Sequence, residues 1–239
     1  SASAMALGGR MQGRDLSEPG AVRLIRGEWP RVLPLERARS NSEVIDCAQP
    51  FADEESRLLF RWLLGRSEDD VRYRLAEMLL SPRIQTVYDR VILDTPPRVT
   101  LGLVNALCAA THLVVPTRLD GLSIEAVQSF LATLDGFRPR PLPPSQRYRV
   151  VGLQKAWSGA RMTEAEQHAL AELDRLFAMR GEPARLFLRD ATLPTMSGVT
   201  RVAGRGLAVQ TEPSVRPEFD RLGRMIAEFA PSYAEAPEE

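Results

Sequence analysis

The chain has 239 residues, of which 44% are hydrophobic and 26% are charged, and 31 basic residues balance 31 acidic ones. These values are typical of a globular chain that can bury a core. The zero net charge gives no overall attraction to nucleic acid, a membrane surface or an acidic partner, so any basic surface must come from local clustering. Lys155 is the only lysine, so chemistry that requires a primary ammonium has one candidate position.

The cysteines and the hydropathy pattern favour the cytoplasm. Cys47 and Cys108 are far apart and form no CxxC spacing, which argues against a disulfide framework or a zinc site and is typical of a reducing compartment. The longest apolar stretch, residues 101–115, contains Asn105 and His112 and is shorter than the ~20 residues that a membrane span needs. No signal peptide is apparent.

The N-terminal part of the chain predicts a linker, two short strands and two helices. Residues 1–19 are rich in glycine, serine and charge without periodicity, which is typical of a linker or an expression scar. The apolar runs at 21–25 and 31–35 each predict a brief strand. Apolar residues then recur at helical spacing over 53–64, which Gly65 can end, and over 71–80.

The run Val91-Ile92-Leu93, closed by Asp94, predicts a strand that is buried on both faces, as in a parallel sheet covered by helices. Strand and helix patterns alternate after it. The expected elements are a helix at 101–110, a strand at 113–116, a helix at 123–134, a loop at 139–144, a strand at 148–153, a helix at 163–179, a strand at 184–188 and a helix at 217–229. This alternation indicates βαβ crossovers and a three-layer α/β fold, with a doubly wound, mostly parallel sheet flanked by helices.

Asp94 is the candidate functional residue of this pattern. In a doubly wound sheet, ligands bind beyond the carboxyl ends of the strands, and a carboxylate there is costly unless it is solvated, hydrogen-bonded or facing a cation. In P-loop enzymes an aspartate at this place orients Mg²⁺, often through a bound water. A strand-end aspartate that only caps the next turn explains this single feature equally well.

The residues around Asp94 resemble the Walker B motif of the ParA/MinD family of partition ATPases. That motif has a tyrosine–aspartate pair, a hydrophobic strand, an aspartate, a small residue and two prolines, and residues 88–97 follow this order. The similarity continues in register through residues 29–34, 105–110, 113–116, 122–126 and 159–163. It implies one α/β domain of the SIMIBI type over residues 20–230, followed by a flexible tail at 231–239.

The resemblance also implies roles for particular residues. Asp94, Thr95 and Pro96 are expected on the nucleotide side, with Asp94 acting on Mg²⁺ indirectly. Gln154 and Lys155 are expected on the adenine side, although a plain strand end explains these two equally well. No catalytic residue is assigned.

Family members bind ATP and Mg²⁺, form homodimers, respond to a ParB-like activator, and position plasmids, chromosomes or other cargo. ParA-like proteins also bind DNA non-specifically through basic residues near their C-terminal helices, since phosphate contacts need little beyond positive charge. The candidates here are Arg185, Arg189, Arg201, Arg205 and Arg216. Solvated or ion-paired arginines are the simpler interpretation of this cluster in so arginine-rich a chain.

The chain departs from the family in its N-terminal part. Family members open with a glycine-rich Walker A loop that carries two lysines. No lysine precedes Lys155, and the spacing of Gly8 and Gly13 is followed by Arg14-Asp15, where Lys and Ser or Thr are needed. We therefore expect this polypeptide to bind no ATP or Mg²⁺ tightly and to hydrolyse no ATP.

Two explanations of this departure stay open. An N-terminally truncated piece of an ordinary ATPase is the simpler one, because the similarity begins after the Walker A loop. A natural homologue that acts as a non-catalytic regulator or scaffold is the other. A SIMIBI-type ligase is disfavoured, because no site for a substrate carboxylate or amine is evident.

Overall fold

The computed structural model divides the chain into two compact units. The first holds the described elements up to Ala110, and the second holds those from His112 onward. The described residues are 19–28, 35–39, 42–45, 47, 49–66, 70–79, 81–95, 98–110, 112–136, 149–155, 162–179, 187–193, 213 and 216–229. The predicted linker at 1–18, strand residues 31–34, loop at 139–144 and tail at 231–239 lie outside these ranges.

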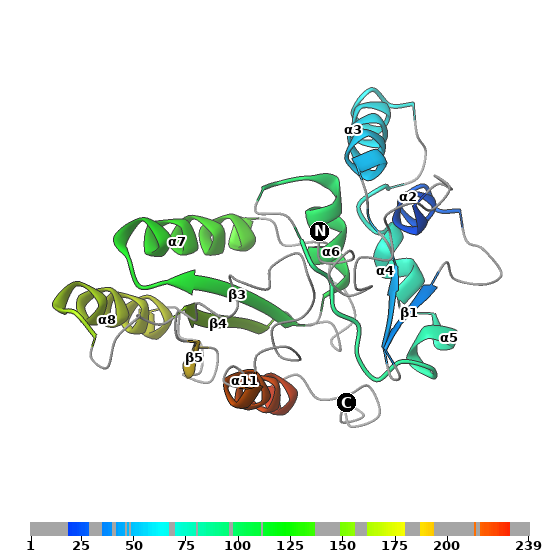
Figure 1. The fold of residues 1–239 in the computed structure, drawn as a ribbon. Coiled ribbons are helices and arrows are strands. Elements are labelled where there is room, and N and C mark those ends of the chain that lie inside the picture. The colour runs from blue at the N-terminus through cyan, green and yellow to red at the C-terminus, as the bar shows by residue number, and fades with distance from the viewer. Residues whose placement is uncertain are drawn as a thin grey trace. The chain divides into compact units, whose positions relative to one another are not determined.

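The described part of the first unit contains helices and a short β-hairpin (Figure 1). Its helices are α2 (Gly20–Ile25), α3 (Gln49–Leu63), α4 (Arg74–Leu79), α5 (Pro82–Gln85) and α6 (Leu101–Ala109). The hairpin strands β1 (Leu35–Arg39) and β2 (Ser42–Ile45) pair antiparallel. The predicted helices at 53–64, 71–80 and 101–110 are thus confirmed, with shifted ends.

The strand that the sequence predicted at 21–25 is instead helix α2. Val22 and Ile25 are buried at a spacing of three residues, which places them on one helical face and not on alternating strand faces. The helix ends at Gly27, whose φ of 76° is in the left-handed region, and the Glu28 amide donates to the Arg23 carbonyl oxygen at 3.0 Å. This arrangement is a Schellman motif, which ends a helix locally.

The same motif ends α3, as Gly65 predicted. Gly65 has a φ of 66°, its amide donates to the carbonyl oxygen of Trp62 at 3.0 Å, and the Arg66 amide donates to that of Arg61 at 2.8 Å. Only glycine adopts this conformation without steric cost. The end of α3 is therefore fixed by its own backbone.

The first unit has two clusters of buried apolar side chains. One joins α2, α3 and α6 through Ile25, Leu58 and Leu101, together with Val71 from the turn before α4. The other forms around Met78, Leu79 and Ile84 of α4 and α5. The second cluster reaches the segment that carries Asp94.

The predicted buried strand at Val91–Leu93 is wrong in this structure. The segment is irregular and pairs with no described strand. Val91 and Leu93 are half-buried against the second cluster, whereas Ile92 between them is 91% exposed. A strand forms only where its backbone groups pair with a neighbour, and the apolar run alone does not supply one.

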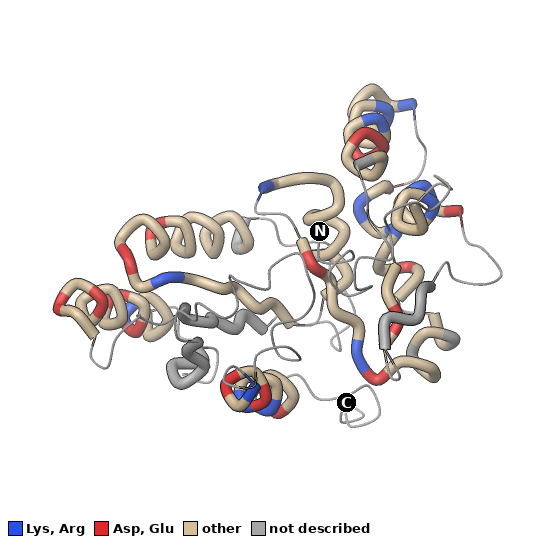
Figure 2. The backbone as a smooth tube through the Cα atoms, viewed as in Figure 1, with Lys and Arg blue, Asp and Glu red and all other residues tan. Residues whose placement is uncertain are grey.

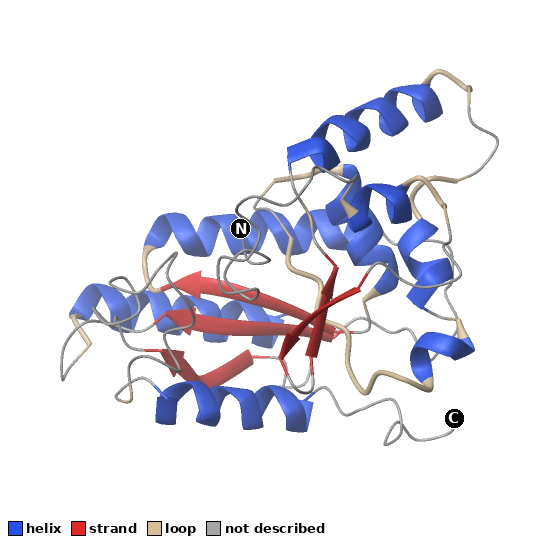
Figure 3. Cartoon of the chain, turned by 45° about the vertical axis from the view of Figure 1, so that its right-hand side comes forward, coloured by secondary structure: helices blue, strands red, loops and turns tan. Residues whose placement is uncertain are grey.

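The second unit is built on a parallel sheet in the order β3-β4-β5, formed by β3 (His112–Arg118), β4 (Arg149–Lys155) and β5 (Phe187–Leu193). Its helices are α7 (Gly121–Gly136), α8 (Glu164–Met179) and α11 (Arg216–Phe229). Figure 3 shows α7 and α8 on one side of the strands and α11 on the other, along β5. The predicted strands and helices of this half are confirmed; a complete three-layer sheet over the whole chain is not.

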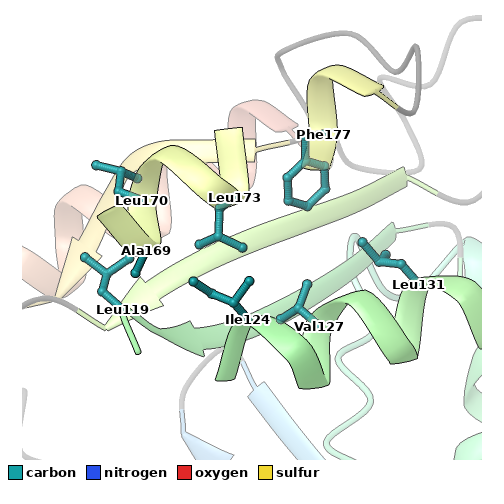
Figure 4. Close-up of a cluster of buried hydrophobic side chains, with 8 residues drawn as sticks. All are labelled: Leu119, Ile124, Val127, Leu131, Ala169, Leu170, Leu173 and Phe177. Atoms are coloured by element: carbon teal, nitrogen blue, oxygen red, sulfur yellow. The ribbon is translucent and has the colours of Figure 1, made fainter. Parts of the chain in front are cut away.

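The core of the second unit lies between α7, α8 and β3 (Figure 4). Ile124 and Leu131 of α7 face Leu173 and Phe177 of α8, and all four are at most 4% exposed. The cluster comprises Leu119, Ile124, Val127, Leu131, Ala169, Leu170, Leu173 and Phe177. Burial of such side chains contributes roughly 1.5–3 kcal/mol each, so this cluster holds the unit together.

Strand β3 is packed on one face only. Leu113 and Val115 pack against the α7–α8 cluster and Thr117 is buried, whereas Val114 and Arg118 are exposed. This alternation follows from the two-residue period of a strand whose one face is covered by helices.

Candidate functional site

Asp94 follows the irregular segment Val91–Leu93 of the first unit, and its side chain is exposed. Thr95 beside it is exposed as well. Upstream, the Tyr88 hydroxyl donates a hydrogen bond to the Glu43 carboxylate on the hairpin, which anchors the start of the segment. An exposed carboxylate keeps its water shell, and this suits an indirect contact with a hydrated cation such as Mg²⁺.

The loop after Asp94 ends at the N-terminus of α6, where side chains bind the free amide groups. The Thr100 hydroxyl accepts a hydrogen bond from the Leu103 amide at 3.3 Å, as an N-cap residue does. The Gly102 amide donates to Glu55 Oε1 on α3 at 2.5 Å. A carboxylate at this end also interacts favourably with the helix dipole. Helix α3 thereby holds the C-terminal end of the loop that carries Asp94.

Gly102 is required for this contact. A Cβ at residue 102 would lie 2.6 Å from Glu55 Oε1 and 3.1 Å from Cε1 of Phe51, which are both on α3. The Glu55 side chain is buried, so a carboxylate displaced from the Gly102 amide would lose this hydrogen bond without reaching water. The absence of a side chain at residue 102 therefore lets α3 and α6 approach each other.

Glu54, the neighbour of Glu55, forms a buried ion pair with Arg26. The Arg26 guanidinium lies 3.0 Å from each carboxylate oxygen of Glu54, through Nε and Nη2. This hydrogen bond, despite burial, holds the pKa of Glu54 below its ordinary value. The Arg74 guanidinium donates in turn to the Arg26 carbonyl oxygen. The pair therefore ties α2, α3 and α4 together.

Asn105 lies at the centre of α6 and is fully buried. Its amide nitrogen donates to the carbonyl oxygens of Val71 at 2.8 Å and Leu101 at 3.1 Å, and its Oδ1 accepts from the Leu75 amide at 3.1 Å. A buried amide with all these partners is satisfied and fixes α6 against α4. Asn105, which the sequence placed in the predicted helix at 101–110, therefore has a structural role here.

Sequence reasoning missed the buried carboxylates of α3. Glu54 is four residues before Leu58 and Glu55 is three before it, so both share a helical face with a core residue. That spacing is the signal that could have found them. Their partners, Arg26 and Gly102, are 28 and 47 residues away, and no local pattern predicts those pairings.

The adenine-side candidates lie in the second unit, at the carboxyl end of β4. In the parallel register, Gln154 pairs with Thr117 of β3 and with Thr192 of β5. Lys155 pairs with Arg118, which brings two basic residues to neighbouring strand ends. This edge is where doubly wound sheets bind ligands. Asp94 belongs to the first unit and Gln154 and Lys155 belong to the second, so we regard them as two separate candidate sites.

Asp120 follows the same edge and caps α7. Its Oδ1 accepts a hydrogen bond from the Ser123 amide at 2.8 Å. That bond lowers the pKa of the Asp120 carboxyl. Asp120 is therefore engaged as a helix cap.

The candidate DNA-binding arginines are only partly described. Arg189 lies in β5, and Arg216 is the first residue of α11, exposed and 3.7 Å from the Asp220 carboxylate. Arg185, Arg201 and Arg205 lie outside the described residues, as does Pro96, which was predicted on the nucleotide side.

Within the described ranges, no group of three or more His, Cys, Asp or Glu side chains could hold a metal ion. A single exposed carboxylate beside a hydroxyl, as at Asp94 and Thr95, still fits a Mg²⁺ ion that keeps most of its waters. No helix in the same ranges has the length and apolarity to cross a membrane.

Known sequences match parts of this chain. A family model described as an AAA domain matches residues 37–143. The chromosome-partitioning ATPase Soj of Thermus thermophilus is 36% identical over 80 residues, which cover 34% of this chain and 31% of the relative. The match therefore spans about a third of the length of Soj.

Comparison with solved structures gives a similar fold. A structure titled as apo McdA of Cyanthece aligns with a TM-score of 0.65 and 13% sequence identity. The alignment covers 90% of this chain and 81% of that chain. Because the identity is low, this likeness supports the fold alone.

Proposed function

Because this chain belongs to the ParA/MinD-like family of partition ATPases, we propose that it acts in the partition or positioning of DNA or other cargo. The observation that carries the proposal is the family's Walker B order of residues around Asp94, with that carboxylate exposed at the end of an anchored segment. In the complete family, ATP-dependent dimerisation performs this work. We propose a homodimer and a ParB-like activator as the corresponding partners.

The proposal assigns Asp94 and Thr95 to the magnesium side of a nucleotide site. The Asp94 carboxylate would hold the ion through water and the Thr95 hydroxyl would lie beside it, since Mg²⁺ gives up its waters reluctantly. When bound, Mg²⁺ neutralises phosphate charge. Gln154 and Lys155, at the edge of the sheet of the second unit, are proposed separately as residues of the adenine side, as the family resemblance implies.

This polypeptide by itself is proposed to hydrolyse no ATP. Hydrolysis in the family uses a Walker A lysine against the phosphates, and the only lysine of this sequence, Lys155, is in β4. We expect the purified chain to release phosphate from ATP no faster than buffer does and to show no heat of Mg-ATP binding. Tight binding by calorimetry, lost in Asp94→Asn, would contradict this part of the proposal and support a working site.

The origin of the missing lysine has a separate test. An in-frame glycine-rich segment with GK[ST] upstream of Ser1 in the genome would establish a longer ATPase. A stop codon or an unrelated sequence there would favour a regulator or scaffold that keeps the fold and a dimer surface without turnover.

DNA contact is a second proposed activity, through Arg189, Arg201, Arg205 and Arg216. The double variant Arg201→Glu/Arg205→Glu should weaken binding to a random-sequence duplex about equally for any sequence, because phosphate contacts carry no base information. Gel-shift titration at two salt concentrations measures this. Unchanged affinity in the variant would eliminate the idea.

A further inference from the structure

Helix α3 has a second apolar face that no described element covers. Its inner face supplies Leu58 to the core, with Phe51 and Trp62 packed against it. On the outer face, Phe60 is 64% exposed and Leu63 and Leu64 are each 65% exposed. Their spacing of three and four residues puts these side chains on one side of the last helical turn.

This outer face is preorganised. The Schellman motif at Gly65 and Arg66 fixes the backbone around Leu63 and Leu64, so a ligand would not have to order it. Binding to a surface that is already ordered avoids part of the entropic cost of association.

Positive charge predominates around the outer face, although the exposed Asp53 lies on the same side of the helix as Arg57 and Phe60. The stretch from Arg57 to Arg66 contains three arginines, at 57, 61 and 66, and no acidic residue. All three are exposed, and Figure 2 shows basic residues as blue bands on the C-terminal half of α3. Glu54 Oε2 lies 3.8 Å from Arg57 Nη1, but Glu54 is buried and is held by Arg26. The surface therefore combines exposed apolar area with a local excess of positive charge.

We propose that this surface, the α3 patch (Arg57, Phe60, Arg61, Leu63, Leu64 and Arg66), docks an amphipathic helix of a protein partner whose apolar side chains are flanked by Asp or Glu. Charge complementarity carries the choice of occupant. A second copy of the chain would bring six arginines and only two Asp53 carboxylates together around the same apolar side chains, and this excess of like charge is unfavourable. Nucleic acid would pair with the arginines but leave the apolar side chains without a function. This interaction is independent of the nucleotide chemistry proposed above.

The test uses a fluorescent helical peptide with leucines at i, i+3, i+4 and i+7 and glutamates beside them, titrated by anisotropy. We expect binding on the order of 100 μM, as for a weak, transient interface. Phe60→Ser should weaken it about tenfold. The reversal Arg57→Glu/Arg61→Glu should abolish it and create binding to a matched peptide with lysines in place of glutamates.

The control is Leu122→Ser, which removes a side chain that is 80% exposed at the start of α7 and should change nothing. Circular dichroism checks that each variant is folded, which is expected because the substituted side chains are exposed. The proposal is overturned if the wild type shows no binding to the acidic peptide at about 1 mM, or if it binds the lysine peptide equally well. It is also overturned if sedimentation shows that the wild type is a dimer and that Phe60→Ser converts it to a monomer. Tighter binding of the wild type to phosphatidylglycerol vesicles than to the peptide would overturn it as well.

Discussion

Replacing Gly102 with alanine tests the contact between α3 and α6 directly. The new Cβ would lie 2.6 Å from Glu55 Oε1, closer than side chains tolerate, and 3.1 Å from Phe51 Cε1. The carboxylate is the end of a flexible side chain, so it can move away, but it then loses its hydrogen bond with the Gly102 amide while it stays buried. The cost is therefore the loss of that bond and not a backbone clash.

The change in the free energy of unfolding caused by Gly102→Ala follows from two opposing effects. A hydrogen bond to a charged group contributes about 1.5–3 kcal/mol, and a buried carboxylate left without its partner adds to the loss. Replacement of glycine by alanine in a helix stabilises by up to about 1 kcal/mol, and by less near the helix start. We expect Gly102→Ala to lower the free energy of unfolding by about 1–2 kcal/mol.

Urea unfolding of four proteins measures this: the wild type, Gly102→Ala, Glu55→Ala and the double variant. With Glu55 truncated, the alanine at residue 102 no longer displaces a carboxylate and should be neutral or slightly stabilising. The coupling energy of the two substitutions should therefore be about 1–3 kcal/mol. Gly223→Ala is the matched control, because a Cβ in the middle of α11 meets nothing within 4 Å; it should stabilise by up to about 1 kcal/mol.

If Gly102→Ala were as stabilising as Gly223→Ala, the proposed energetic role of the hydrogen bond between Glu55 and the Gly102 amide would be refuted. It would also fail if the substitutions at 55 and 102 added within about 0.5 kcal/mol, which is the behaviour of independent sites.

Three further predictions concern buried polar groups of the first unit. Asn105→Ala should lower the free energy of unfolding by about 2–4 kcal/mol in urea titrations, because it leaves the Leu75 amide and the Val71 carbonyl without their partner; a loss below about 1 kcal/mol would contradict the network. Because Arg26 keeps the pKa of Glu54 below the ordinary 4.5, the native state binds fewer protons there than the unfolded state, so the stabilisation is complete above pH 4.5 and lost as pH falls through the native value. Glu54→Gln should therefore be less stable near neutral pH but lose less stability on acidification, and parallel urea midpoints of the two proteins against pH would argue against the pair. Burial raises the pKa of Cys108 to about 11, so at pH 8 iodoacetamide should label the exposed Cys47 and reach Cys108 only after unfolding, as peptide mass spectrometry would show; equal labelling of both thiols in the native protein would contradict this burial.

The sequence predicted the elements whose signals are local. Gly65 ended α3 as expected, because its left-handed conformation is a property of one residue. The helix at 101–109 begins after Thr100, a residue type that caps helices, and the helix after Thr163 begins with reciprocal hydrogen bonds between Thr163 and Glu166. The alternation of strands and helices in the second unit was likewise sufficient to predict its parallel sheet.

The wrong or missing predictions all concern residues whose structure depends on partners that are distant in the sequence. Residues 91–93 have the composition of a buried strand, but a strand is defined by the neighbour that pairs with it, and composition does not identify that neighbour. The short run at 21–25 fits either a strand or a helix, and the burial of Ile25 against Leu58 of α3 favours the helix. The burial of Glu55 depends on a glycine 47 residues away.

The exposed segment around Ile92 also bears on the colloidal behaviour of the protein. Three consecutive β-branched or aliphatic residues that pair with no described strand are a template for pairing between molecules. In the sequence, Asp89-Arg90 precede the run, and Asp94 and two prolines follow it. Flanking charges and prolines of this kind limit aggregation. The negative charge of Asp94 therefore helps to keep concentrated protein from assembling through this segment, whether or not nucleotide is present.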